Sequence, residues 1–173
     1  MAQPVPCSAY WLLAAALLLG PGAPASAAAA PGLATVSLFK PLLLAKTTDM
    51  NFGSLFPPAT GIGTIKLDPN GGATVYAGAT AAGASPTSRA VFTGQATRLS
   101  LVFISISAGT VTLTRAGGTE TLLANDFTID NAGALRIVGN TSYTIGIGAT
   151  LSVPSTAAGG TYVGTFTLTA DYF

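Results

Sequence analysis

The feature that most constrains the fold is a two-residue alternation of apolar and other side chains, most regular in the C-terminal segment Gly160–Phe173. Its even positions carry the apolar residues Tyr162, Phe166, Leu168 and Tyr172, with small Gly164 and Ala170 in the same register. Successive side chains of a strand point to opposite faces, so this pattern predicts one strand that reaches the carboxyl terminus. Terminal residues fray unless something holds them, so such a strand needs a partner along its edge.

The chain after Ala30 repeats this pattern in short runs rich in Thr, Val, Ile, Phe and Tyr, separated by Gly, Pro, Asn and Asp. Such runs are typical of an antiparallel β-sandwich. The clearest hairpin joins Gly63–Leu67 to Ala73–Tyr76 through Asp68–Gly72, because Pro69 presets one turn position and Asn-Gly accepts positive φ. We expect all of the domain to be β-structure.

Two runs further along the chain yield specific predictions about faces. Leu99, Leu101 and Phe103 fit one buried face. A longer run alternates from Tyr143 to Val153, with Gly146 and Gly148 on its outer face, where glycines indicate a bulge.

The N-terminus is typical of an export signal. An apolar core, Trp11–Leu19, is followed by the breaker Gly20–Pro24 and by Ala25-Ser26-Ala27, the small-residue pattern of a cleavage site. The core is too short for a stable membrane span, which needs about 20 apolar residues. We therefore predict a cleaved signal peptide over residues 1–27, an N-terminal extension or edge strand over 28–44, and a β-sandwich domain over 45–173.

Charge and composition exclude several classes of function. Charged residues make up 8% of the chain, and the net charge is +1, with no basic cluster of the kind that binds nucleic acid. The chain has no His, and its one cysteine, Cys7, leaves with the predicted signal. Since His and Cys supply most catalytic bases, thiolates and soft metal ligands, we predict a protein that is not an enzyme and has no catalytic, cofactor or metal site.

Two sets of residues carry a resemblance to known families. Lys40-Pro41-Leu42, Met50–Gly53, Leu151–Pro154 and Gly160–Phe166 resemble hallmarks of the domain of unknown function 4402 family, exported pilin-like domains of Gram-negative bacteria. The C-terminal strand, with Gly160 near its start and Tyr172 as the penultimate residue, resembles the C-terminal motif of chaperone–usher pilus subunits.

The second resemblance implies a mechanism. Such subunits have an immunoglobulin-like sandwich that lacks its last strand, which a periplasmic chaperone supplies before the N-terminal extension of the next subunit replaces it. It implies donor side chains at Val36, Leu38, Leu42 and Leu44, and strand-pairing positions at Gly160, Tyr162, Gly164, Phe166, Leu168 and Tyr172. The acceptor groove would run between Tyr162–Phe173 and a strand near Met50–Leu55.

These observations predict an exported structural subunit of a fimbrium or pilus-like fibre, in the periplasm, at the cell surface or outside the cell. Its partners would be copies of itself or related subunits, a periplasmic chaperone and an outer-membrane usher. Pro41 and Lys40 interrupt the donor run, so Val36–Leu44 either pairs with a neighbour or completes its own domain as an edge strand. The alternative functions are a self-contained secreted binding module, adhesive or carbohydrate-binding, and an enzyme with a carboxylate site.

Overall fold

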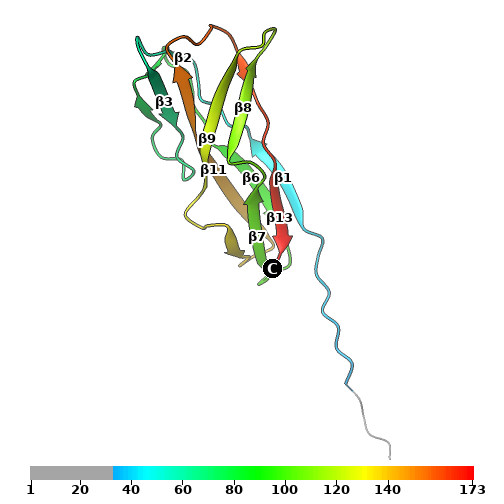
Figure 1. Ribbon diagram of the computed structural model, residues 1–173. Helices are drawn as coiled ribbons and strands as arrows, with labels where there is room; N and C mark the ends of the chain where they lie inside the picture. The colour runs from blue at the N-terminus through cyan, green and yellow to red at the C-terminus, as the bar shows by residue number, and fades with distance from the viewer. Residues whose placement is uncertain (1–32) are drawn as a thin grey trace, which may run out of the picture. The chain divides into compact units, whose positions relative to one another are not determined.

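The computed structural model describes residues 33–173, of which Ser37–Phe173 form the compact domain considered below (Figure 1). Its secondary structure consists of thirteen strands: β1 Leu43–Thr48, β2 Leu55–Phe56, β3 Ile62–Lys66, β4 Val75–Ala77, β5 Thr80–Ala81, β6 Ala90–Gln95, β7 Leu101–Ile106, β8 Thr110–Arg115, β9 Thr121–Ile129, β10 Leu135–Ile137, β11 Ser142–Pro154, β12 Tyr162–Val163 and β13 Leu168–Tyr172.

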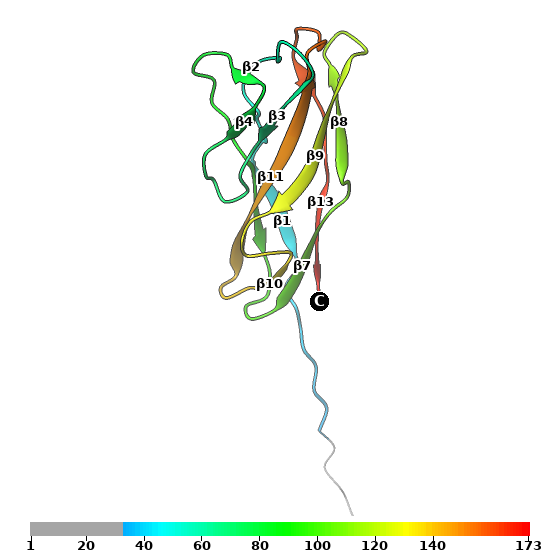
Figure 2. The same cartoon turned by 60° about the vertical axis from the view of Figure 1, so that its left-hand side comes forward.

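The strands form three antiparallel sheets. The largest has eight strands in the order β1-β6-β11-β9-β8-β12, with β3 attached to β11 and β4 to β3. A second sheet has the order β10-β7-β13, and a small third one pairs β2 with β5. Core side chains lie between the large sheet and the three-stranded sheet. Figures 1 and 2 show the strands of these sheets from two directions. The prediction of an all-β antiparallel sandwich is confirmed.

Strand β11 joins the two halves of the core. It pairs with β6 through Ser142–Ile147 and with β3 through Thr150–Pro154, while β9 covers its other edge. The inward side chains Ile145 and Ile147 belong to a first core cluster with Val102, Ile104 and Leu168. Further along the same strand, Leu151 and Val153 belong to a second cluster with Ile65, Leu122 and Ala124. The regular alternation of this run therefore predicts its buried face correctly.

A bulge in β9 changes which residues of that strand face the core. The pairing with β11 shifts between Gly148 and Thr150, and Asp126 has a φ of 50°. A bulge adds one residue to one strand, which moves later side chains to the opposite face. Leu122 faces inward before the shift, and Phe127 does so after it, packing against both core clusters.

The hairpin predicted at Asp68–Gly72 is confirmed, since β3 pairs with β4 around it. Its loop packs on the two glycines of β11, where a side chain at Gly146 would collide with Pro69 O and one at Gly148 with Leu67 O. Leu67 N also donates a hydrogen bond to Ala149 O at 2.9 Å. Close backbone approach therefore explains both glycines.

The prediction that Leu99, Leu101 and Phe103 form a buried face is wrong. Val102 and Ile104 face the core, whereas Leu99 and Phe103 are exposed. Both faces of this run are apolar, so alternation could not choose between them. The choice is made by the tertiary structure, in which β7 lies between β10 and β13.

The predicted continuous C-terminal strand is divided in the structure. Its first part, β12, pairs with β8 in the large sheet, and its second part, β13, pairs with β7 in the three-stranded sheet. Residues 164–167 carry the chain from one sheet to the other. The alternation nevertheless holds, because Phe166, Leu168 and Tyr172 pack against the first core cluster.

We predict that Gly148→Ala destabilises the domain by about 1–3 kcal/mol, because the added methyl group forces the hairpin loop away from β11. Gly139→Ala is the matched control, since nothing lies within 4 Å of its Cβ position. Urea unfolding measures both. Equal stability of the two variants would contradict the proposed packing of the hairpin on β11.

Candidate functional site

The candidate site is the open side of the sandwich, between the free edges of β13 and β1. Within the described residues, β13 pairs with β7 alone and β1 with β6 alone. Ser107 N donates to Thr167 O and Phe173 N donates to Leu101 O, each at 3.0 Å, so odd-numbered residues direct their backbone groups toward β7. By antiparallel geometry, Leu168, Ala170 and Tyr172 direct theirs toward the open side.

A groove of about 880 Å³ lies at one end of this open side. One border is Met50–Leu55, and the other is Gly160–Phe166. Its floor is apolar and includes Leu113, Leu122, Ala124, Leu151 and Val153. The last four of these belong to the second core cluster, so the groove opens directly onto the core of the domain.

The groove border contains four of the residues predicted to take part in strand pairing. Gly160 has a φ of 151°, and a side chain there would lie 2.8 Å from Arg115 Cδ. Tyr162 donates a hydrogen bond to Ala158 O at 2.7 Å. A side chain at Gly164 would lie 2.8 Å from Thr112 O, so only glycine lets this segment approach β8 so closely.

Phe166 completes the border and links it to the core. Its ring lies 5.3 Å from that of Phe127 and 6.1 Å from that of Phe92, between centroids. These aromatic contacts hold the segment that crosses between the sheets, where few ladder hydrogen bonds exist. Leu168, the next inward residue, is buried in the first cluster.

Tyr172 connects the last strand to the root of the N-terminal extension. Its hydroxyl donates to Lys40 O at 2.7 Å and accepts from Thr97 N at 2.9 Å. Lys40 N donates to Thr97 Oγ1 at 2.6 Å, and the ring of Phe39 packs 5.1 Å from that of Tyr172. The extension therefore leaves the domain beside the carboxyl terminus, as Figures 1 and 2 show.

The predicted donor residues fall into two groups. Val36 and Leu38 are 82% and 87% exposed. Leu42 and Leu44 instead pack against the first core cluster of their own domain, and β1 begins at Leu43. We therefore restrict the donor segment to residues before Pro41; its first part, residues 28–32, and the predicted signal peptide lie outside the described residues.

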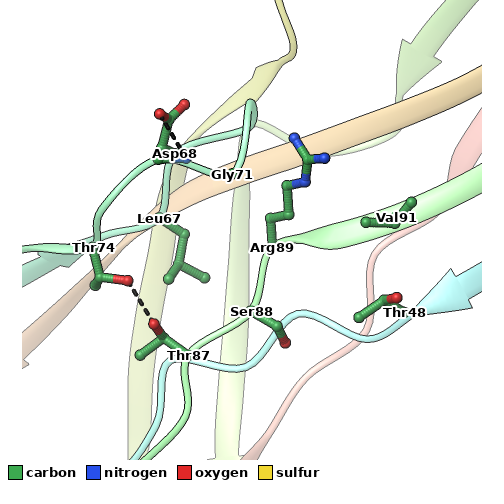
Figure 3. Close-up of a pocket in the computed structure, with 10 residues that line it drawn as sticks. Thr48, Leu67, Asp68, Gly71, Thr74, Thr87, Ser88, Arg89 and Val91 are labelled. Atoms are coloured by element: carbon green, nitrogen blue, oxygen red, sulfur yellow. Dashed lines mark hydrogen bonds between the residues drawn. The ribbon is translucent and has the colours of Figure 1, made fainter.

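A polar hollow of about 250 Å³ lies elsewhere, beside the β3–β4 hairpin (Figure 3). Asp68 accepts hydrogen bonds from Asn70 N at 2.9 Å and Gly72 N at 3.1 Å, and the bond from Asn70 is the main cause of a lowered pKa of this carboxyl. Arg89 donates to Pro69 O, and Thr74 bonds to Thr87. These side chains hold the hairpin loop, so the hollow gives no support to a ligand site.

Within residues 33–173, no three side chains of the His, Cys, Asp or Glu type lie together as they would to hold a metal ion. That part of the chain contains no helix able to cross a membrane.

A comparison with known protein families shows to which family the chain belongs. The profile of DUF4402, described as a domain of unknown function, matches residues 42–172. The chain belongs to the DUF4402 family. Neither a curated protein nor a solved structure matches it. The DUF4402 match begins at Leu42, so it includes β1 and the last strand but leaves out the exposed extension with Val36 and Leu38.

The predicted borders overlap those of the groove but differ in extent, since the groove ends at Phe166 and the predicted border Tyr162–Phe173 runs on through β13. The floor was not predicted: the alternation in β11 predicts an inward Leu151 without indicating that it faces a gap, and Leu122 of β9 was not singled out. Phe39 was also missed, although it packs on Tyr172. A cluster of apolar residues just before Pro41 is the only signal that could have drawn attention to it.

We predict that Tyr172→Phe lowers stability by about 0.5–1.5 kcal/mol, because it removes the hydroxyl that joins Lys40 O to Thr97 N. Hydrogen exchange at the Thr97 amide should quicken with it. Tyr76→Phe, at a partly exposed tyrosine of β4, is the control and should change neither quantity. An unchanged rate of hydrogen exchange at the Thr97 amide in Tyr172→Phe would contradict the hydrogen bond from this amide to the Tyr172 hydroxyl.

Proposed function

We propose that this protein is an exported, non-enzymatic structural subunit of a fimbrial or pilus-like fibre, assembled by strand complementation. The observation that carries the proposal is the groove that opens onto the second core cluster beside a free strand edge. Unpaired backbone groups are costly in water. A strand laid in the groove would pair such groups and add an apolar layer over the floor, whose core side chains Leu122, Ala124, Leu151 and Val153 are already buried.

The N-terminal extension has the chemistry of such a strand. Ala34, Val36 and Leu38 alternate with Thr35 and Ser37, which gives one apolar and one polar face. Each apolar side chain moved from water into the groove contributes about 1.5–3 kcal/mol when fully buried. The exposure of Val36 and Leu38 leaves them free for this role.

The dimensions of the donor and the groove also agree. Leu33–Leu38, the described part of the extension ahead of the anchored Phe39 and Lys40, spans about 20 Å when extended, and the border Gly160–Phe166 spans about 23 Å, at about 3.3 Å per residue. The root of the extension lies beside Tyr172, whereas β2, which ends the other border, lies toward the opposite end of the domain (Figure 1). A donor at one end and an acceptor toward the other favour head-to-tail contacts, which build fibres.

The other partners follow from the same chemistry. A groove open to water needs protection during export, so we propose that a periplasmic chaperone supplies a temporary strand and an outer-membrane usher exchanges it for the extension of the next subunit. The alternative of an adhesive or carbohydrate-binding module has no comparable observation in its favour.

The test compares the mature chain, residues 28–173, with a variant carrying Val36→Asp and Leu38→Asp. We expect the unaltered chain to form concentration-dependent oligomers in sedimentation velocity and the variant to stay monomeric, because charged side chains cannot enter an apolar groove. A labelled peptide of residues 28–40 should bind the empty groove of the variant. At a peptide concentration 100 times its Kd, the domain should gain about 2.7 kcal/mol of stability.

The matched control is a peptide of the same length with the same two Asp substitutions, which should not bind. Removal of Ala28–Phe39 provides a second comparison. A mature chain that is monomeric and equally stable with and without this segment would refute strand complementation.

A further inference from the structure

Apolar side chains gather at one end of the outer face of the three-stranded sheet. Leu101 pairs with Ile137 on β10 and lies opposite Phe173 beyond β13, because Phe173 N donates to Leu101 O. In the next row, Phe103 pairs with Leu135 on β10 and with the exposed Asp171 on β13. The five apolar side chains, which we call the end patch, lie on the side of the sheet away from Val102 and Ile104. They are Leu101, Phe103, Leu135, Ile137 and Phe173.

Four of the five side chains of the end patch are exposed. Ile137 is 74% and Phe173 82% exposed, and Leu135 and Phe103 are about half exposed. Cross-strand neighbours lie about 5 Å apart, so the rows form one continuous surface. On the large sheet, the corresponding outward positions of β6 and β11 include Thr93, Thr144 and Ser142. An apolar surface of several hundred Å² at one place marks a binding site.

We propose that the end patch is the contact surface for the groove-bearing end of a second copy of this chain. The inference rests on the proposed function, because the occupant is argued from the position of the extension. Lys40 is held by Tyr172, whose neighbour Phe173 belongs to the end patch. Because Phe39 and Lys40 are anchored beside Tyr172, no flexible linker separates the donated strand from its own domain. A copy that accepts this strand must therefore lie against the end of the donor domain that carries Tyr172 and Phe173.

The acceptor copy has exposed apolar residues next to its groove, where the end patch of the donor copy would lie. Phe56 follows the groove border at Leu55, and Val163 lies in the opposite border; both are 60% exposed. The ion pairs of the described residues involve neither the end patch nor Phe56 and Val163, which suits a contact made by burial of apolar surface. The contact is heterologous, since different surfaces of the two copies meet.

The first test uses two leucines of matched exposure in the mature chain. Leu135 is 48% exposed in the end patch, and Leu123 is 49% exposed on β9 of the large sheet. We expect Leu135→Ser to weaken self-association about tenfold in sedimentation equilibrium and Leu123→Ser to leave it unchanged. Equal effects of the two substitutions would overturn the proposal.

Peptide binding separates this proposal from strand complementation itself. Each serine substitution is added to the chain carrying Val36→Asp and Leu38→Asp, and binding of the labelled 28–40 peptide is measured. If the peptide binds and Leu135→Ser assembles normally, the end patch is refuted and strand complementation stands. If the peptide fails to bind the groove of the chain without the serine substitutions, strand complementation is refuted, and the end patch proposal falls with it.

Cysteine crosslinking tests the identity of the occupant, since residues 28–173 contain no cysteine. Mature chains carrying Ile137→Cys are mixed with chains carrying Phe56→Cys and oxidised. We expect mixed disulfide dimers, because the two positions belong to the surfaces that meet. Dimers formed mainly between two Ile137→Cys chains, or no crosslinks in an assembling mixture, would overturn the head-to-tail contact.

Discussion

The structure depends on the backbone pairing of β11. This strand forms ladders with β6, β3 and β9, and its inward face runs without interruption from Ile145 to Val153. A backbone paired along both edges fixes the register of its neighbours, and the register decides which side chains enter the core. The bulge at Asp126 and the close contact of the hairpin loop with Gly146 and Gly148 are adjustments to this one strand.

The two ends of β11 meet different surroundings. Its first half is covered by the three-stranded sheet, which closes the first core cluster. Its second half faces Phe52, Leu55 and Tyr162 and the groove between them. The chain passes from the large sheet to the three-stranded sheet at residues 164–167, between β12 and β13. The three-stranded sheet therefore covers the first core cluster but not the second. The open groove is thus a consequence of where the final segment changes sheets.

The features of the proposed donor and acceptor meet in the C-terminal segment, residues 160–173. The backbone of β13 forms a free edge, Phe166 supports the groove border, and Tyr172 fixes the point where the extension leaves. The exposed end patch ends in Phe173. This segment therefore links the groove, the extension and the end patch, and the strand complementation that we propose would give all three one purpose. Membership of DUF4402 is compatible with this reading and adds no activity of its own.

Much of the fold could be predicted where alternation is one-sided. Ile145, Ile147 and Leu151 alternate with small or polar residues, so their burial followed directly from the period of a strand. The same reasoning failed at Leu101–Ile104, where consecutive apolar residues leave both faces equivalent. The resemblance to pilus subunits implied donor side chains at Leu42 and Leu44, and pairing within the same domain stayed open, because a local pattern cannot tell whether the partner of a strand belongs to the same domain. The structure packs both leucines against their own first core cluster.

The all-β class, the β3–β4 hairpin and the inward residues of the C-terminal segment follow from the amino-acid sequence alone, because each rests on local geometry and on the period of two. Three features needed the folded chain: the last segment divides into β12 and β13, Leu42 and Leu44 join their own core, and a groove remains open above Leu122 and Leu151. These outcomes depend on pairing between segments far apart in the chain, which no local pattern specifies.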